Sequence, residues 1–363
     1  MKRIANLLGL PWRKPPPLGA TPSDVVHAEN KWRLLRYRPR AQGLAFRTPV
    51  LMVPSLINRH YVLDLTPGKS MVEYLVEQGH DVYVIDWGTP GPEDRYLDFD
   101  TICATYLGRA VRIAARSGPR GQVHLLGYCL GGTLTTIYAA AFPEKVASLV
   151  ALAAPVAFAA GGRLTRWVRS PGFDLDALVD GAGNVPWRLM QASFQMIKPT
   201  LNLSKAVTVI DRAWNDEFLD GFLALEAWGA DNVSFPGECY RTWVGQLYQQ
   251  DALAKGTFLL AGRRADPRSI ECPVLAITFA DDYIVPEASA APLIDWVASR
   301  DKHRVNQRGG HVGAVVSRKA RHGLWPFVSG FWAQRDECGT LSASDRSTSH
   351  SPGPQLAADR AAG

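Results

Sequence analysis

Short apolar runs of strand length recur along the chain, and stretches with helical spacing separate them. Glycine, proline or polar clusters bound the runs, which indicates buried strands rather than pieces of long helices. The segment 70–78 ends at a glycine, and 133–142 is small and apolar up to a proline, as in helices. This alternation is typical of a parallel sheet with crossover helices. The predicted strands are 50–53, 82–85, 122–126, 146–156 and 273–279.

The pattern changes between residues 161 and 255. Glycines and prolines become frequent, aromatic residues are dense, and helical spacing is visible in 215–228 and 240–253. No strand pattern alternates with these helices, so we interpret the stretch as a helical insertion between two strands of the sheet. Because it follows the unit that contains a sharp glycine turn at 127–132, we expect a cap over a site, although extra core would give the same pattern.

These patterns predict an α/β fold in five consecutive parts. Residues 1–45 form a basic, proline-rich N-terminal segment, and 46–160 form the first part of the sheet core. The cap covers 161–255 and the second part of the core covers 256–333. Residues 334–363 turn to Gly, Ser, Asp, Pro and Ala without a periodic apolar pattern, which predicts a disordered tail.

The N-terminal segment contains two features of its own. Residues 1–10 are expected to fray, although a short basic amphipathic piece that lies on an apolar surface also fits them. Residues 31–40 alternate cationic and apolar side chains, which fits an edge strand.

The distribution of charge and the cysteine content bear on whether the protein binds nucleic acid and on its cellular compartment. The chain has 363 residues, 47% of them hydrophobic, and a net charge of +6. Residues 1–40 hold nine Lys and Arg against two acids, so the rest of the chain sums to about −1, which argues against nucleic-acid binding by the main body. Five cysteines without metal-ligand spacing, no apolar stretch long enough for a membrane span and a short N-terminal apolar run favour a cytoplasmic protein.

The strongest chemical motif is Gly127-Tyr128-Cys129-Leu130-Gly131-Gly132, between a predicted strand and a predicted helix. The G-x-C-x-G spacing is that of a nucleophile elbow, in which glycines permit a strained turn that lifts the nucleophile above the sheet. A buried free cysteine in a glycine-rich turn is the ordinary alternative. The elbow predicts that Cys129 is a catalytic nucleophile if an acid and a histidine follow in the right order.

An acid and a histidine do follow, each after a predicted strand. Asp282 comes after strand 273–279, with Asp281 as a less favoured neighbour, and His311 lies in a glycine-rich loop after 304–306. The order nucleophile, acid, histidine is that of α/β hydrolases. We therefore predict an α/β-hydrolase fold with a mostly parallel sheet, a helical cap and the catalytic residues Cys129, Asp282 and His311.

These residues resemble the polyhydroxyalkanoate synthases, and within them the short catalytic subunit of the two-subunit enzymes. The resemblance runs from about residue 25 to residue 333. Besides the elbow and Gly310-His311, it is carried by Val53 to Arg59, Tyr61 to Leu65, Asp86-Trp87-Gly88, and Asp282 with Ile284-Val285-Pro286. One position departs from the family, which usually has histidine directly after the catalytic aspartate, where this chain has Tyr283.

The resemblance implies an acyltransferase that polymerises (R)-3-hydroxyacyl-CoA, such as 3-hydroxybutyryl-CoA, and releases CoA. Cys129 would carry the acyl group, and the backbone N–H groups of Leu130 and Ile57 would hold the oxyanion. No metal and no cofactor are expected, because the CoA thioester is the substrate. The implied partners are a companion synthase subunit, a homodimer or hetero-oligomer, and the surface of polyester granules in the cytoplasm.

Two other functions remain open at this point. A cysteine hydrolase, either a thioesterase or a polyester depolymerase, would have an identical elbow, and only its products would differ. A non-catalytic granule-binding protein that retains the fold is the second alternative, and the complete set Cys129, Asp282 and His311 argues against it.

Overall fold

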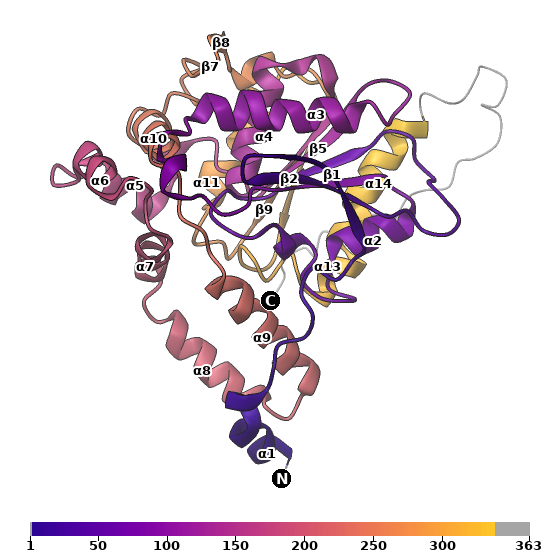
Figure 1. Ribbon diagram of the computed structural model, residues 1–363, viewed down its shortest axis with the longest axis vertical. Helices are drawn as coiled ribbons and strands as arrows, with labels where there is room; N and C mark the ends of the chain where they lie inside the picture. The colour runs from indigo at the N-terminus through magenta and orange to yellow at the C-terminus, as the bar shows by residue number, and fades with distance from the viewer. Residues whose placement is uncertain (1, 338–363) are drawn as a thin grey trace, which may run out of the picture.

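An eight-stranded sheet runs through the centre of the molecule (Figure 1). The computed structural model describes residues 2–337. The strand order is β1-β2-β4-β3-β5-β6-β9-β10, in which all pairs from β4 to β10 are parallel and β1 and β2 are antiparallel to their neighbours. The strands are β1 (Ser23–Glu29), β2 (Trp32–Tyr37), β3 (Val50–Val53), β4 (Val82–Asp86), β5 (Val123–Tyr128), β6 (Val146–Leu152), β9 (Val274–Phe279) and β10 (Lys302–Gln307).

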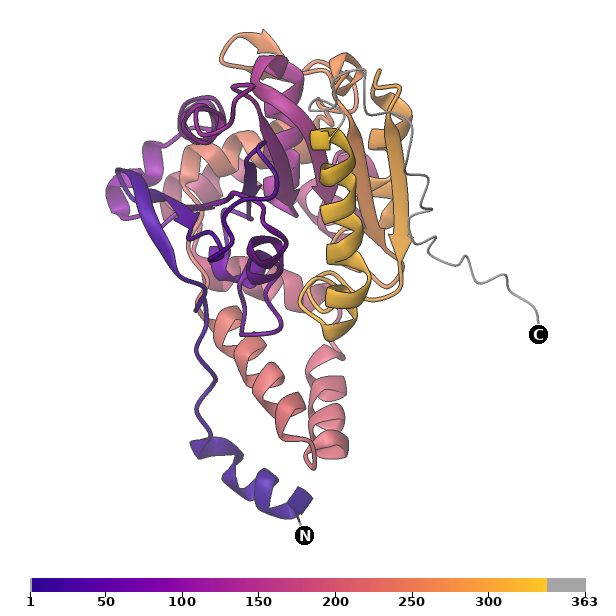
Figure 2. The same cartoon turned by 90° about the vertical axis from the view of Figure 1, so that its right-hand side faces the viewer.

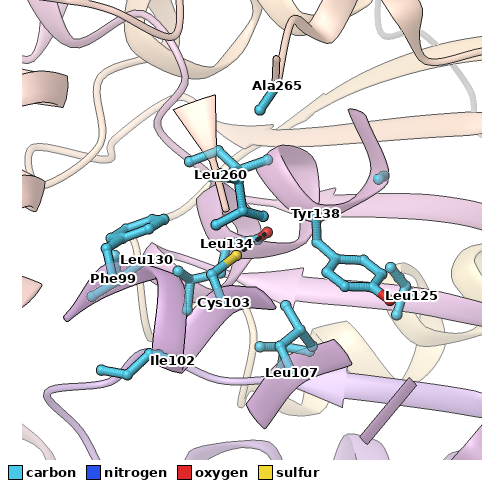
Figure 3. Packing of buried hydrophobic residues seen from close by; sticks show 14 of the residues in the cluster. Phe99, Ile102, Cys103, Leu107, Leu125, Leu130, Leu134, Tyr138, Leu260 and Ala265 are labelled. Atoms are coloured by element: carbon cyan, nitrogen blue, oxygen red, sulfur yellow. Dashed lines mark hydrogen bonds between the residues drawn. The ribbon is translucent and has the colours of Figure 1, made fainter. Parts of the chain in front are cut away.

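Helices pack on both faces of the sheet and bury separate apolar clusters. On one face, α3 (Gly108–Ala115) and α4 (Leu130–Ala141) join a cluster that includes Cys103, Leu125 and Leu134 (Figure 3). On the other face, α2 (Met71–Gln78) and α14 (Leu324–Glu337) join a cluster with Met52 and Trp325. Strands β3, β4, β5 and β9 are buried along their whole length, which explains why they are mostly apolar in sequence.

Local sequence explains where the crossover helices begin and end. The Ser70 hydroxyl accepts a hydrogen bond from the N–H of Glu73 at the start of α2. The helix ends at Gly79, whose φ of 93° lies in the left-handed region that glycine adopts at low cost. The predicted helix 70–78 is therefore confirmed to within one residue.

Six α-helices and a π-helix lie between β6 and β9, in the stretch expected for the cap. Helices α8 and α9 extend away from the sheet, as both ribbon views show (Figures 1 and 2). A short β-hairpin of β7 (Leu259–Leu260) and β8 (Arg263–Arg264) leads back to the core. The cap helices are α5 (Gly162–Val168), α6 (Leu175–Ala182), α7 (Trp187–Ile197), α8 (Leu201–Arg212), α9 (Asp216–Ala230), α10 (Gly237–Thr242) and the π-helix Trp243–Gln249.

The N-terminal end is more ordered than the sequence suggested. Residues 1–10 were expected to fray, but Lys2–Gly9 forms helix α1, which lies against the α8–α9 hairpin (Figure 2). The guanidinium of Arg13 donates to Asp216 and Asp220 at 3.0 and 2.7 Å, and the amide of Asn6 donates to Asp216 at 2.9 Å. The expectation was wrong because these acidic partners lie more than 200 positions away in the sequence.

Two expected boundaries of the core also shift. The sheet begins at β1, well before residue 46, so β2 lies between β1 and β4 and is not the edge strand that residues 31–40 were expected to form. At the other end, α14 continues past residue 333 to Glu337, because the buried carboxylate of Asp336 accepts a hydrogen bond from the N–H of Arg47 at 2.5 Å. The rest of the expected tail, residues 338–363, lies outside the described residues.

Candidate active site

The backbone at Cys129 is a sharp strand-to-helix turn. Cys129 follows β5 directly, has a φ of 56° and a ψ of −126°, and precedes the first residue of α4. A positive φ at a non-glycine residue is a strained conformation, of the kind found at nucleophile elbows. A Cβ added to Gly131 would lie 2.0 Å from the carbonyl oxygen of Val53, so the motif glycines allow α4 to approach β3 closely.

The structure brings Asp282 and His311 together from two neighbouring strands. His311 Nδ1 lies 2.6 Å from Asp282 Oδ2, and both side chains are buried. The other carboxylate oxygen accepts the backbone N–H groups of Ile284 and Val285 at 2.9 and 2.8 Å. Asp281 is exposed and accepts only the Gly309 N–H in the contacts found for it, so Asp282 is the partner of the histidine.

Charge around His311 favours its protonated form. Burial by itself lowers the pKa of this imidazole, but a negative charge on Cys129 and the hydrogen bond to Asp282 outweigh burial and raise the pKa to about 10. Cys129 and His311 line the same cavity. The arrangement therefore places an imidazole that favours its protonated form beside a cysteine, which is the pairing of side chains that cysteine enzymes use.

Tyr128 is a contributor to the site that the sequence reasoning missed. Its hydroxyl donates to the main-chain carbonyl of His311 at 3.0 Å, and its ring stacks on the imidazole with centroids 5.3 Å apart. The only sequence signal was its place inside the elbow motif, directly before the nucleophile.

Cys129 stands where two cavities meet. One cavity has a volume of about 330 Å³ and an aromatic and aliphatic wall that includes Trp167, Trp243 and Tyr248 from the cap. The other has a volume of about 180 Å³ and contains His311 together with polar side chains of the cap and core. The residues common to both cavities are Ile57, Cys129, Met190, Phe194 and Ile284.

Comparison with known proteins places this site in a family. A model of the N-terminus of poly-beta-hydroxybutyrate polymerase (PhaC) matches residues 16–75, and an alpha/beta-hydrolase model matches residues 48–316. The chain is 38% identical to the poly(3-hydroxyalkanoate) polymerase subunit PhaC of Haloferax mediterranei over 91% of this chain and 68% of that protein. The chain belongs to the PhaC family. The resemblance inferred from the sequence motifs is thus confirmed.

Two other members of the family differ in how much of their own length aligns with this chain. The chain is 34% identical to PhaC of Thiocystis violacea, over 86% of this chain and 88% of the relative. It is 28% identical to PhaC of Cupriavidus necator, over 84% of this chain and 53% of the relative.

Solved structures similar to this one confirm the α/β-hydrolase fold. Their sequence identities to this chain are low, so the similarity shows the fold alone. The TM-score is 0.52 with BpoC from Mycobacterium tuberculosis, at 16% identity, covering 86% of this chain and 99% of BpoC. It is 0.50 with the thioesterase domain from the curacin biosynthetic pathway, at 14% identity, covering 85% of this chain and 99% of that domain.

The two residues expected to bind the oxyanion both lie beside Cys129 in this PhaC family member. Leu130 and Ile57 line the larger cavity next to Cys129. Leu130 is the first residue of α4, where backbone N–H groups have no acceptor within the helix. The Ile57 N–H lies 3.5 Å from the Ser55 hydroxyl, which is long for a hydrogen bond.

Tyr283, the departure from the family pattern, is half-buried beside the cap. The ammonium of Lys198 lies 5.1 Å from the centre of its ring, a cation–π distance. The position directly after Asp282 therefore contacts the end of α7 in this chain.

Residues 2–337 contain neither a membrane-spanning helix nor a cluster of metal ligands. None of the helices there has both the length and the apolar character needed to span a bilayer. No cluster of three histidine, cysteine or acidic side chains is arranged to hold a metal ion in that range.

Proposed function

We propose that this chain is an acyltransferase that polymerises (R)-3-hydroxyacyl-CoA, such as 3-hydroxybutyryl-CoA, into polyhydroxyalkanoate and releases CoA. The observation that carries the proposal is the strained cysteine elbow beside the Asp282–His311 pair in a chain of the PhaC family. A thiol nucleophile suits a thioester substrate, because exchange of one thioester for another is nearly balanced. A serine would hold the acyl group as a more stable ester.

In the first half-reaction the thiolate of Cys129 attacks the thioester carbonyl. The N–H groups of Leu130 and Ile57 hold the oxyanion that develops on the carbonyl oxygen. Collapse of this intermediate expels the CoA thiolate, which takes the proton of the His311 imidazolium, and the acyl group remains on sulfur. Asp282 holds the imidazole by its Nδ1 atom and stabilises the cation. No cofactor is proposed, because the thioester itself is the activated acyl group.

In the second half-reaction the 3-hydroxyl of a second monomer or of a chain end becomes the nucleophile. His311 takes its proton, the oxygen attacks the acyl-enzyme, an oxoester forms and Cys129 leaves as the thiolate. Polymer grows only if this hydroxyl outcompetes water. The aromatic wall of the larger cavity supports that selectivity, because it presents few groups that bind water.

The two cavities suit the two substrates of this step. The polar residues Asn58, Gln191 and Asn232 line the smaller cavity together with His311, so we assign the incoming hydroxyl to it. The apolar larger cavity would receive the acyl and polyester side. Cys129 lines both cavities, as a condensation of two acyl units on its sulfur requires.

We further propose that the chain works in the cytoplasm at the surface of polyester granules, with a companion subunit or as a homodimer. The relatives are named as subunits, which supports the companion. Helix α1 and the α8–α9 hairpin lie together at the end of the molecule away from the sheet (Figure 2), and exposed apolar side chains on these segments support the granule contact. The most exposed apolar side chains there are Ile4, Leu8, Trp12, Leu203, Val207, Ile210 and Trp214. Deletion of residues 1–14 should release the protein from granules in a sedimentation assay, and unchanged sedimentation would reject this contact.

One assay tests the activity against its alternatives. Purified protein, with and without a candidate companion, is incubated with 3-hydroxybutyryl-CoA while CoA, free 3-hydroxybutyrate and insoluble polyester are measured. CoA with polyester supports the proposal, whereas CoA with free acid indicates a hydrolase. Cys129→Ala should abolish CoA release. Failure of iodoacetamide to label Cys129, together with absent CoA release, would favour a non-catalytic granule protein.

A further inference from the structure

The loop that carries Ile57 is held in place by the end of cap helix α9. The side-chain amide of Asn58 donates to Asn232 Oδ1 at 2.5 Å, and Asn232 in turn donates to the carbonyl of Gly229 at 2.8 Å. Asn58 and Asn232 are 174 positions apart and both line the smaller cavity beside Cys129. The two asparagines therefore join the core loop to the cap at the wall of the site.

Main-chain contacts reinforce this junction on both sides of Asn58. The N–H of Val233 donates to the carbonyl of Ile57 at 3.3 Å, and the indole N–H of Trp228 donates to the carbonyl of Arg59 at 3.0 Å. Because the carbonyl of Ile57 and the side chain of the next residue are both held, rotation of the backbone at Ile57 is restricted. The N–H of Ile57 belongs to the preceding peptide unit, so these contacts act on it through the Cα of Ile57, whose position they fix.

An ionic contact extends the junction toward the surface. Arg59 Nε lies 3.0 Å from Asp231 Oδ1, and the hydroxyl of Tyr61 donates to the second carboxylate oxygen at 2.7 Å. Burial, and then the hydrogen bond to Asp231, raise the pKa of the Tyr61 phenol, so it stays a proton donor at neutral pH. Cap residues 228–233 thus contact loop residues 57–61 at five points.

We propose that Asn232 is a positioning residue for the Ile57 N–H, so that the cap must be docked at this junction for the oxyanion to be held. The role rests on the proposed function, because it acts through the oxyanion of acyl transfer. Within the loop, the Ile57 N–H donates to the Ser55 hydroxyl oxygen, but this distance is long at 3.5 Å, so the loop does not set the orientation alone. The Asn58–Asn232 contact is the shortest of the contacts between this loop and the cap.

Two isosteric variants separate the hydrogen bond from the charge. Asn232→Asp keeps the oxygen that accepts from Asn58, whereas Asn58→Asp places two acceptors face to face, and both add one negative charge at the same place. Loss of an oxyanion donor costs about 10²–10³ in kcat, so Asn58→Asp and Asn232→Ala should lower kcat for CoA release by roughly 10-fold to 100-fold with KM little changed. Asn232→Asp keeps the acceptor for Asn58 but loses the donor to the Gly229 carbonyl, so it should lower kcat less than Asn58→Asp does.

Alkylation of Cys129 by iodoacetamide supplies the second measurement. This substitution forms no oxyanion, so its rate and pH profile should be unchanged in Asn232→Ala if only the oxyanion loop is affected. Asn58→Asp and Asn232→Asp add the same charge and should therefore match each other in this measurement. Glu226→Ala is the matched control, because Glu226 lies on α9, just before Asn232 in the chain, but forms an exposed ion pair with Lys205. It should retain the kcat of the wild type.

Three results would overturn the role of Asn232. They are an unchanged kcat in Asn58→Asp and Asn232→Ala, a rise in KM alone, which would indicate direct substrate binding, and a matching loss of alkylation rate, which would indicate general disruption. A wild-type protein that releases no CoA would instead reject the proposed function itself.

Discussion

The phenol of Tyr128 donates a hydrogen bond to the main-chain carbonyl of His311 at 3.0 Å, and the two rings stack. Tyr128 is the last residue of β5 and precedes the nucleophile directly, whereas His311 lies in the loop after β10. The strand that presents the sulfur therefore also holds the loop that presents the base. The position of His311 relative to Cys129 is therefore set by this contact as well as by the loop itself.

Removal of the Tyr128 hydroxyl should weaken catalysis without removing the base. Tyr128→Phe keeps the stacked ring but leaves the carbonyl of His311 without this donor, and one such hydrogen bond contributes about 1 kcal/mol. We expect kcat for CoA release to fall by about tenfold or less, since about 1.4 kcal/mol corresponds to a factor of ten. Steady-state kinetics with 3-hydroxybutyryl-CoA measure the effect, and a kcat equal to that of the wild type would show that the loop holds itself.

Replacement of Asp282 by asparagine changes the size of the side chain very little but should strongly reduce activity. In Asp282→Asn, one oxygen can still accept from Ile284 and Val285, but the amide nitrogen would face His311 Nδ1 and disfavour the tautomer that the base needs. We expect CoA release to fall by about 10²–10⁴-fold. Asp281→Asn is the control, because Asp281 is exposed and contacts only the backbone of Gly309, and a comparable loss there would contradict the assignment.

The close approach of α4 to β3 predicts a stability effect at Gly131. A methyl group in Gly131→Ala would meet backbone oxygens of Val53 and Pro54 at 2.0 and 2.6 Å, and backbone cannot move aside easily. We expect a loss of about 1–3 kcal/mol in the free energy of unfolding, or more. In Gly181→Ala, within α6, the added methyl meets nothing within 4 Å, so this control should be neutral or more stable by up to about 1 kcal/mol. Urea unfolding compares them, and equal midpoints for the two variants would refute the steric argument.

Two buried histidines on the side of the sheet covered by α14 predict loss of stability in acid. Burial lowers the pKa of His80 to about 4 and that of His124 to about 3, from the ordinary value of 6.5, against an opposing effect of Asp336. Below pH 6.5 the two histidines take up protons in the unfolded chain but not in the folded chain. Their full contribution to the free energy of unfolding is therefore present above pH 6.5, and it is lost as the pH falls to about 4 for His80 and about 3 for His124. Between pH 7 and pH 5 the loss is about 2 kcal/mol per histidine.

The free energy of unfolding at pH 7 and pH 5 tests this linkage. His124→Gln should show a smaller loss between the two pH values than the wild type. His303→Gln removes an exposed histidine and should leave the loss unchanged. A His124→Gln protein that loses as much stability as the wild type would show that other groups control the acid response.

Much of the fold and of the site could be predicted because local patterns encode them. Continuous apolar runs predicted the buried parallel strands, and the glycines around Cys129 predicted the strained turn that the φ of 56° shows. The positions of Asp282 and His311 after neighbouring strands predicted that they would meet, and they lie 2.6 Å apart. The motifs near the elbow predicted the family to which the chain belongs.

The sequence by itself thus determined the fold class, the family and the strained turn at Cys129, because strand burial and turn geometry depend on residues a few positions apart. Only the tertiary structure decided that α1 is anchored on the cap, that β2 lies inside the sheet and that Asn58 meets Asn232. Each of these depends on side chains brought together from distant positions. Hydrogen-bonding groups on polar residues leave no periodic signal, so their partners are set by how the cap and core pack.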